Sequence, residues 1–391
     1  MFTGCSRFHH LQREFVYVSA RQVYLHDRVA AVSNRVGLVT NGEALEVVEH
    51  GKRFVKVRTP KGEVGWLEEH AVIDDKLYAQ FQDLAKKHAD DPVEANGELR
   101  DDLYLHVLPG RETPHFLLVA GNSKVQLLQR GTVPKAAPPG ALPVAKVKTA
   151  KSPETRSNPE PAPVPMEDWW LVRDGGGHTG WLLANRLDVD VPDEVGQYAE
   201  GQRMVAAYPI AKVTDDGSGR ESHRGEKPGK MGSAEKAKRT AISEPVTKDA
   251  DETGAPVSKE ITEFVTVLSP PRGGLPYDFD QIRVFTWSLN HHRYETAYRL
   301  HGIQGYLPVK ISQENVNGQV EPVFSFQIAS GLDVTVDPES GVTRPAAPRT
   351  IAFRLEGNIV KRTGADQGPI ILTHDPVETA KAKAAAKKKK R

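Results

Sequence analysis

The stretch that decides the fold is "FVKVRTPKGEVGWL" (Phe54 to Leu67), because a closely similar stretch, "WWLVRDGGGHTGWL" (Trp169 to Leu182), follows it later in the chain. The two align without gaps at a shift of 115 residues. In that alignment a Val-Arg pair and a Gly-Trp-Leu triplet recur at matching positions. A framework repeated in this way predicts a duplicated structural unit.

The residues around the first copy have the pattern of a small β unit. Short runs rich in valine and aromatic residues alternate between Glu14 and Ile73, and Asn41-Gly42, His50-Gly51 and Lys61-Gly62 separate them as turn signals. This spacing predicts a small barrel or sandwich. Apolar residues then recur at helical spacing in "KLYAQFQDLAKKH", which predicts a linking helix.

The second unit carries an insertion. Tyr104-Leu105-His106 repeats Tyr24-Leu25-His26 at a shift of 80 residues, so 115 minus 80, or 35, extra residues lie before the second Gly-Trp pair. The segment from Pro134 to Pro165 holds nine prolines and no aromatic residue. Such a composition favours extended, solvated chain, so we expect a disordered loop between two strands.

These two units resemble bacterial SH3 domains, which are small barrels of five to seven strands found in many bacterial envelope proteins. The resemblance rests on "VYLH", the Gly42 turn before "EALEVVE", the "RFVKV" strand and the closing "GEVGWL". The chain departs from the family after the first strand, where Asp27-Arg28-Val29 replaces the usual Asn-Val-Arg-Ser-Gly-Pro-like stretch. This departure puts in doubt any ligand groove that the family forms there.

The remaining sequence predicts a third β region. "RMVAAYPIAKV" and "EFVTVLS" are strand-like and flank a segment without leucine or aromatic residues, and we expect them to pair across it. A hairpin is expected around Gly357-Asn358. "AYRLHGIQGYLPV" resembles the closing stretch of the first copy, so this region is either a third SH3-like barrel or an unassigned β domain.

The sequence therefore predicts a mainly β protein with two SH3-like small barrels, a C-terminal β domain and long disordered insertions. The predicted divisions are an N-terminal arm (1–13), barrel 1 (14–74), a linking helix (75–96), barrel 2 (97–196, insertion 134–165), the C-terminal β domain (197–373, insertion 214–258) and a Lys-rich disordered tail (374–391).

Charge is distributed unevenly along the 391 residues. The net charge is +1, but "AKAKAAAKKKKR" at the end holds seven positive charges, which leaves +1 minus 7, or −6, for the rest. An acidic body argues against nucleic acid as a partner of the folded domains. The tail is interpreted as a solubilising terminus, or as a contact for nucleic acid, anionic lipid or wall polymer.

The single cysteine, Cys5, excludes an intramolecular disulfide. "MFTGCS" resembles the end of a bacterial lipoprotein signal, which implies lipidation of Cys5, with the true start of the protein upstream. The alternative is an ordinary exposed cysteine. Since no apolar run reaches the roughly 18 to 20 residues that a spanning helix needs, we expect a periplasmic or cell-envelope location, with a lipid anchor rather than a membrane span.

No catalytic or metal-binding constellation stands out, and no cofactor, metal or enzymatic activity is expected. The pairs His9-His10 and His291-His292 point to opposite faces of an extended strand, and "LNHHRYE" is interpreted as a polar turn. Asp278 and Asp280 share one strand face, which suits a cation site or paired acid/base chemistry, or else a solvated turn before a strand. The glycine runs lack the Lys-Ser/Thr of a phosphate loop.

The resemblance implies a non-catalytic binding or scaffold role in a bacterial envelope, with extended peptide or peptidoglycan stem peptide captured at a barrel edge. The alternatives are an enzyme with its site among Asp278, Asp280, His291, His292 and His301, and a structural spacer without a ligand. An indole after glycine can also simply cap a small barrel core. The aromatic residues expected to contact the ligand are Tyr24, Trp66, Tyr104, Trp170, Trp181, Trp287, Tyr298 and Tyr306.

Overall fold

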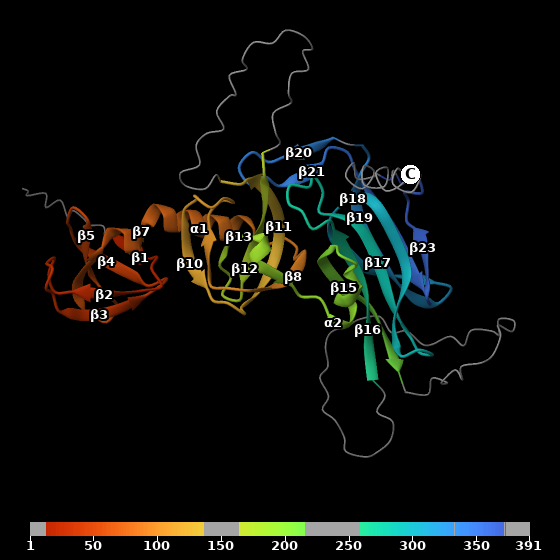
Figure 1. The fold of residues 1–391 in the computed structure, drawn as a ribbon, viewed down its shortest axis with the longest axis horizontal. Coiled ribbons are helices and arrows are strands. Elements are labelled where there is room, and N and C mark those ends of the chain that lie inside the picture. The colour runs from red at the N-terminus through yellow and green to blue at the C-terminus, as the bar shows by residue number, and fades with distance from the viewer. Residues whose placement is uncertain (1–12, 137–163, 216–258, 332, 371, 373–391) are drawn as a thin grey trace, which may run out of the picture.

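The computed structural model describes residues 13–136, 164–215, 259–331, 333–370 and 372. Three antiparallel β units lie in a row, with the N-terminal unit at one end and one α-helix between the first two units (Figure 1). The mainly β fold that the sequence predicts is confirmed. The predicted arm, most of both insertions and the tail lie outside the described residues.

Barrel 1 is a seven-stranded sheet in the order β3-β2-β6-β5-β4-β1-β7. Alternate residues of its strands point inward, so Leu25, Val57 and Leu67 are almost completely buried while their neighbours face water. A 3-10 turn, η1 (Glu69–Ala71), precedes the last strand. The strands are β1 (Phe15–Val18), β2 (Gln22–His26), β3 (Arg35–Thr40), β4 (Ala44–His50), β5 (Phe54–Arg58), β6 (Val64–Glu68) and β7 (Val72–Asp74).

The predicted helix is present as α1 (Asp75–Lys87). It begins at Asp74, whose side chain accepts a hydrogen bond from the amide of Leu77 at 2.9 Å, as a good N-cap does. Tyr78 of the helix stacks on Tyr17 of barrel 1 at 3.7 Å between ring centroids, and both rings meet Phe116 of the next unit edge-on. The helix therefore joins the two barrels through an aromatic contact.

Barrel 2 has the strand order β10-β9-β13-β12-β11-β8-β14, in which each strand takes the place of the strand numbered seven lower in barrel 1. The ends of its insertion continue the β11–β12 ladder out to Pro134 and Met166. A 3-10 turn, η2 (Ala184–Arg186), again precedes the last strand. The strands are β8 (Ala95–Leu99), β9 (Leu103–His106), β10 (His115–Val119), β11 (Lys124–Pro134), β12 (Met166–Asp174), β13 (Thr179–Leu183) and β14 (Leu187–Val189).

The C-terminal unit is an open seven-stranded sheet in the order β15-β16-β17-β18-β19-β22-β23. The predicted pairing across the second insertion and the predicted hairpin before Ile359 are both confirmed. The alternative of a third SH3-like barrel is wrong, because "AYRLHGIQGYLPV" lies within one long strand of this sheet. The elements are α2 (Asp193–Gly196), η3 (Gln197–Ala199), β15 (Arg203–Asp215), β16 (Lys259–Ser269), β17 (Phe279–Ser288), β18 (Arg293–Val316), β19 (Gln319–Ala329), β20 (Val334–Val336), β21 (Thr343–Pro345), β22 (Pro348–Glu356) and β23 (Ile359–Thr363).

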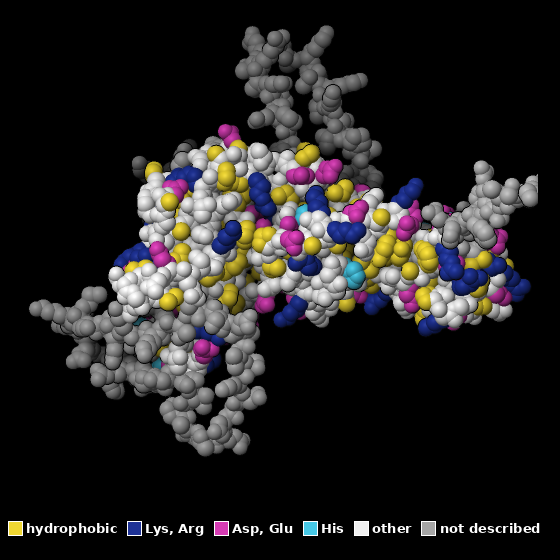
Figure 2. Space-filling view, turned by 180° about the vertical axis from the view of Figure 1, so that it is seen from behind, with side chains coloured by type: hydrophobic (Ala, Val, Ile, Leu, Met, Phe, Trp, Pro, Cys, Tyr) yellow, Lys and Arg dark blue, Asp and Glu magenta, His cyan; other side chains and the backbone are white. Residues whose placement is uncertain are grey.

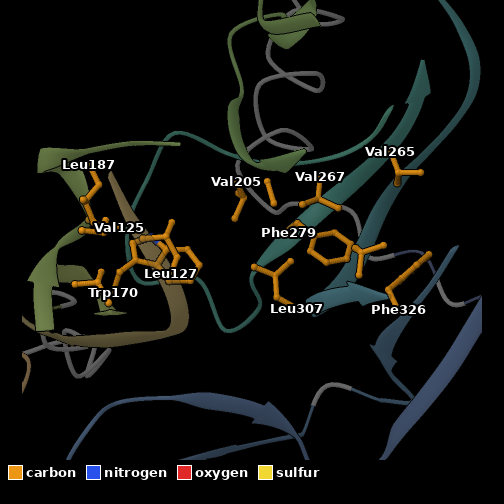
Figure 3. Packing of buried hydrophobic residues seen from close by; sticks show 14 of the residues in the cluster. Val125, Leu127, Trp170, Leu187, Val205, Val265, Val267, Phe279, Leu307 and Phe326 are labelled. Carbon is orange, nitrogen blue, oxygen red and sulfur yellow. The ribbon is translucent and has the colours of Figure 1, made fainter. Parts of the chain in front are cut away.

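Barrel 2 and the C-terminal sheet share one hydrophobic core. Trp170 and Leu127 of the barrel lie in the same buried cluster as Val205, Phe279 and Phe326 of the sheet (Figure 3). Most of the barrel 1 core forms a separate cluster around Leu25, Leu45 and Val57. Because apolar burial is the main favourable term in folding, the second and third units should behave as one body.

Candidate functional site

The outer side of barrel 1 carries aromatic and basic side chains together. Trp66 on β6 lies across the ladder from Lys56 on β5, whose ammonium is 5.7 Å from the indole centroid. On β2, the Tyr24 ring lies 4.0 Å from the Arg35 guanidinium carbon. We call Tyr24, Phe54, Lys56, Trp66 and Val48 the aromatic face of barrel 1.

Every member of the aromatic face keeps some contact with solvent. Tyr24 is 37% exposed and Val48 44% exposed, and the other three are partly exposed. In Figure 2, which shows barrel 1 at the right from the back, hydrophobic, basic and acidic side chains are interspersed on the visible surface. A cation over an exposed aromatic ring contributes about 0.5 to 1 kcal/mol.

The same side of barrel 2 is covered by the chain itself. Strand register places Trp181, Leu171 and Trp169 where barrel 1 has Trp66, Lys56 and Phe54. All three are buried, in a cluster with Leu84 of α1 and Val342 of the segment before β21. The leucine where barrel 1 has a lysine fits this difference, because a covered face needs an apolar side chain and an open face does not.

A glycine lies beneath the indole in both barrels. A Cβ at Gly51 would come within 3.4 Å of Trp66, and a Cβ at Gly131 within 3.0 Å of Trp181. At Gly131 the same Cβ would also lie 2.1 Å from the carbonyl oxygen of Ser340. Gly131 forms an antiparallel bridge with Val342, so this glycine lets a second segment of the chain approach the tryptophan closely.

Three of the predicted contact residues are buried. Trp170 belongs to the shared core, Trp181 to the covered face, and Tyr306 is fully buried with its hydroxyl donating to the Pro276 carbonyl at 2.9 Å. The expectation that either Trp169 or Trp170 is exposed is wrong, because one points into the barrel and α1 and Val342 cover the other. None of these side chains can meet a ligand at the surface of this structure.

The other predicted residues are spread over different surfaces. Tyr104 is partly exposed beside His115, Trp287 donates its indole N–H to Asp215 at 2.7 Å, and Tyr298 packs on Phe353. Tyr24 and Trp66 are both partly exposed and lie on the same side of the neighbouring strands β2 and β6, so the structure favours barrel 1 among the predicted sites. Lys56 and Phe54 were not predicted, although the alignment of the two copies places Lys56 at the same position as Leu171.

The five residues of the enzyme hypothesis do not meet in one pocket. Asp278 pairs with Arg130, and Asp280 lies 3.9 Å from His301. His291 and His292 lie in the turn between β17 and β18, where they contact Glu295 and Asp215 respectively. The interpretation of "LNHHRYE" as a turn is confirmed, whereas a solvated turn at Asp278 and Asp280 is wrong, since both are buried.

Asp278 is buried because Arg130 of barrel 2 reaches it. The guanidinium donates to Asp278 at 2.9 Å and to Asp168 at 3.1 Å, and both carboxylates are almost fully buried. Its remaining N–H groups bond Thr132 and the carbonyls of Leu275 and Tyr277. Arg130 thus fixes barrel 2 against the C-terminal sheet, and all five of its donors are used.

The described residues contain no group of three or more His, Cys, Asp or Glu side chains placed to hold a metal ion. None of the described helices has both the length and the apolar character to cross a membrane. Cys5 lies outside the described residues, so its lipidation stays a prediction.

The family model of the bacterial SH3 domain matches residues 25–72. These residues form a bacterial SH3 domain. The match begins at Leu25 on β2 and ends in β7, so this SH3 domain includes all of the aromatic face except Tyr24. The predicted resemblance is confirmed there, and such a domain is in keeping with association with the cell envelope. No curated protein matches the chain.

Solved structures that match include two NlpC proteins from Trichomonas vaginalis and an NlpC/P60 family protein from Bacillus cereus. NlpC2 is 9% identical over 48% of this chain and 53% of its own, with a TM-score of 0.15. The Bacillus protein is 14% identical over 48% and 62%, with a TM-score of 0.21. NlpC1 is 8% identical over 73% and 87%, with a TM-score of 0.15. The chain thus spans little more than half the length of NlpC2 and about three fifths of the Bacillus protein.

The prediction that the protein is not an enzyme is contradicted by these matches, which are to NlpC and NlpC/P60 family proteins. TM-scores this low carry no argument about the fold or about which residues would act.

Proposed function

We propose that the bacterial SH3 domain of this chain binds an extended peptide or the stem peptide of peptidoglycan through the aromatic face of barrel 1. The observation that carries the proposal is the contrast between the two barrels. Trp66 is partly exposed, whereas its counterpart Trp181 is 2% exposed beneath the chain's own segment. The surface that is open in barrel 1 is equivalent to the surface of barrel 2 on which a segment of the same chain packs.

The chemistry of the aromatic face suits a peptide with carboxylate groups. An indole and a neighbouring aromatic ring offer apolar contact area at small entropic cost, since each side chain has only two rotatable bonds. Arg35 and Lys56 lie against the two rings and add positive charge, and Lys56 also lies 3.9 Å from Glu49. A ligand with aliphatic side chains and carboxylates would satisfy both kinds of contact, and a cell-envelope location, in the periplasm or at a membrane, follows from such a ligand.

Cosedimentation with purified peptidoglycan tests this function. The parent chain should pellet with the sacculi, and Trp66→Ala should weaken binding by about 2 kcal/mol, or roughly 30-fold, as expected for a central aromatic contact. Ile359→Ala is a matched control, because Ile359 is an exposed apolar residue on the C-terminal sheet, at 62% exposure. Equal retention of the parent and a folded Trp66→Ala variant contradicts the proposal.

A further inference from the structure

A cavity of about 270 Å³ lies between barrel 2 and the C-terminal sheet. Its polar lining comes from the segment after α1, from β11 and from the strands β18, β19 and β21. Ligand pockets usually measure about 300 to 1,000 Å³, so this one suits a molecule of amino-acid or dipeptide size. The residues that matter for its chemistry are Asp91, Glu94, Gln129, Lys310 and Arg344.

Glu94 is the most constrained of these residues. Its side chain is 2% exposed, its Oε1 lies 3.7 Å from Nη2 of Arg344, and its Oε2 is buried with no hydrogen-bond partner in the described part of the chain. Two hydrogen bonds fix its backbone: its amide donates to the carbonyl of Leu127 at 2.8 Å, and its carbonyl accepts from the hydroxyl of Tyr208. A buried oxygen without a partner is costly, and a ligand that hydrogen-bonds to it would recover that cost.

The cavity carries charge of both signs. Asp91 accepts from Gln129 at 2.6 Å and lies 2.7 Å from His88, and it lines the cavity together with Glu94. Arg344, whose side chain is 37% exposed, and the exposed Lys310 supply two cations to the lining. A ligand that carried only an anion would leave the acidic side unused, and one that carried only a cation would face two like charges.

We propose that this cavity binds a zwitterionic ligand of amino-acid or dipeptide size, with its ammonium at Glu94 and Asp91 and its carboxylate at Arg344 and Lys310. The ammonium supplies the hydrogen-bond donor that Oε2 of Glu94 lacks. The two cations pair with the carboxylate at the more exposed end of the cavity. The site is separate from the aromatic face of barrel 1, so it does not depend on the function proposed for that face.

Binding should be coupled to release of a proton. Burial raises the pKa of Glu94 well above its usual range, and Asp278 and Asp91 raise it further, while Arg344 and Arg130 oppose them. The other titratable groups around the cavity are Tyr208, whose pKa is raised by burial and by the Glu94 carboxylate, His88, which contacts Asp91, and the lining residue Lys310. A bound ammonium favours ionised Glu94, so the carboxyl should lose its proton to the buffer on binding.

Titration calorimetry with L-alanyl-L-alanine tests the site on the full chain. The parent should bind this dipeptide at millimolar concentration or below. N-acetyl-L-alanyl-L-alanine lacks the ammonium and L-alanyl-L-alanine amide lacks the carboxylate, so both should bind at least tenfold more weakly, the usual effect of losing one charged hydrogen bond. No detectable binding of the dipeptide, or equal binding of all three compounds, overturns the proposal.

Two variants test which residues bind the ammonium and the carboxylate of the ligand. Glu94→Gln keeps the shape of the side chain and should abolish both tight binding and proton release, measured by repeating the titration in buffers of different ionisation enthalpy. Arg344 is partly exposed, so Arg344→Gln should keep the fold. This variant should lower affinity for the dipeptide but not for its amide. Glu112→Gln, an exposed residue between β9 and β10, is the matched control and should bind like the parent. Unchanged affinity in both site variants overturns the proposal.

Discussion

Replacing Arg130 by methionine should weaken the junction between barrel 2 and the C-terminal sheet more than any surface change. The side chains of Arg130, Asp168 and Asp278 are only 2 to 3% exposed, and the guanidinium makes hydrogen bonds to both carboxylates. Methionine removes the nearest cation from two buried carboxylates, which keep only the longer contacts of Asp168 with Arg203 (3.5 Å) and of Asp278 with Arg344 (4.0 Å). Breaking a buried ion pair in this way costs about 3 to 5 kcal/mol. For a body of this size the midpoint of thermal unfolding should fall by roughly 6 to 20 °C.

The matched control is Arg100→Met. Arg100 also binds an aspartate with two nitrogens, but that pair with Asp188 is more than half exposed on both sides. Exposed pairs contribute about 1 kcal/mol or less. Guanidinium denaturation followed by tryptophan fluorescence measures both variants, with Trp169 and Trp181 as buried reporters next to the junction. Equal losses of unfolding free energy in the two variants would refute the reasoning.

Three further predictions concern residues of the two barrels. Gly131→Ala should lower unfolding free energy by about 1 to 3 kcal/mol because its Cβ meets Ser340, and Gly51→Ala should cost less; equal losses in chemical denaturation would contradict this. Trp181→Ala should cost about 3 to 5 kcal/mol and Trp66→Ala clearly less, measured in the same way; the reverse order would be inconsistent with the burial of Trp181. Burial lowers the pKa of His106 to about 4, so this neutral imidazole contributes stability above pH 6.5 that is lost as the pH falls towards 4. In His106→Gln the melting temperature should change less over that range, and an unchanged pH profile would count against this role.

Much of the fold follows from local sequence patterns. Alternating apolar residues and Gly-containing turns predicted the strands of both barrels, and apolar residues at helical spacing predicted α1. The repeated Gly-Trp framework predicted that the two barrels share one plan, and their strand orders agree. These features are predictable because each depends on neighbours in the sequence or on the identity of two similar stretches.

The accessible site was not predictable in the same way. Trp66 and Trp181 occupy the same position in similar sequences, and only the placement of Val342 and α1 makes one buried and the other exposed. The sequence allowed a solvated turn at Asp278, because its partner Arg130 lies 148 positions earlier in the chain and local patterns do not reveal it. The sequence by itself determined the β units, the similarity of two of them and the linking helix. The tertiary structure decided which aromatic face stays open and where charges are buried, because burial depends on contacts between segments that are far apart along the chain.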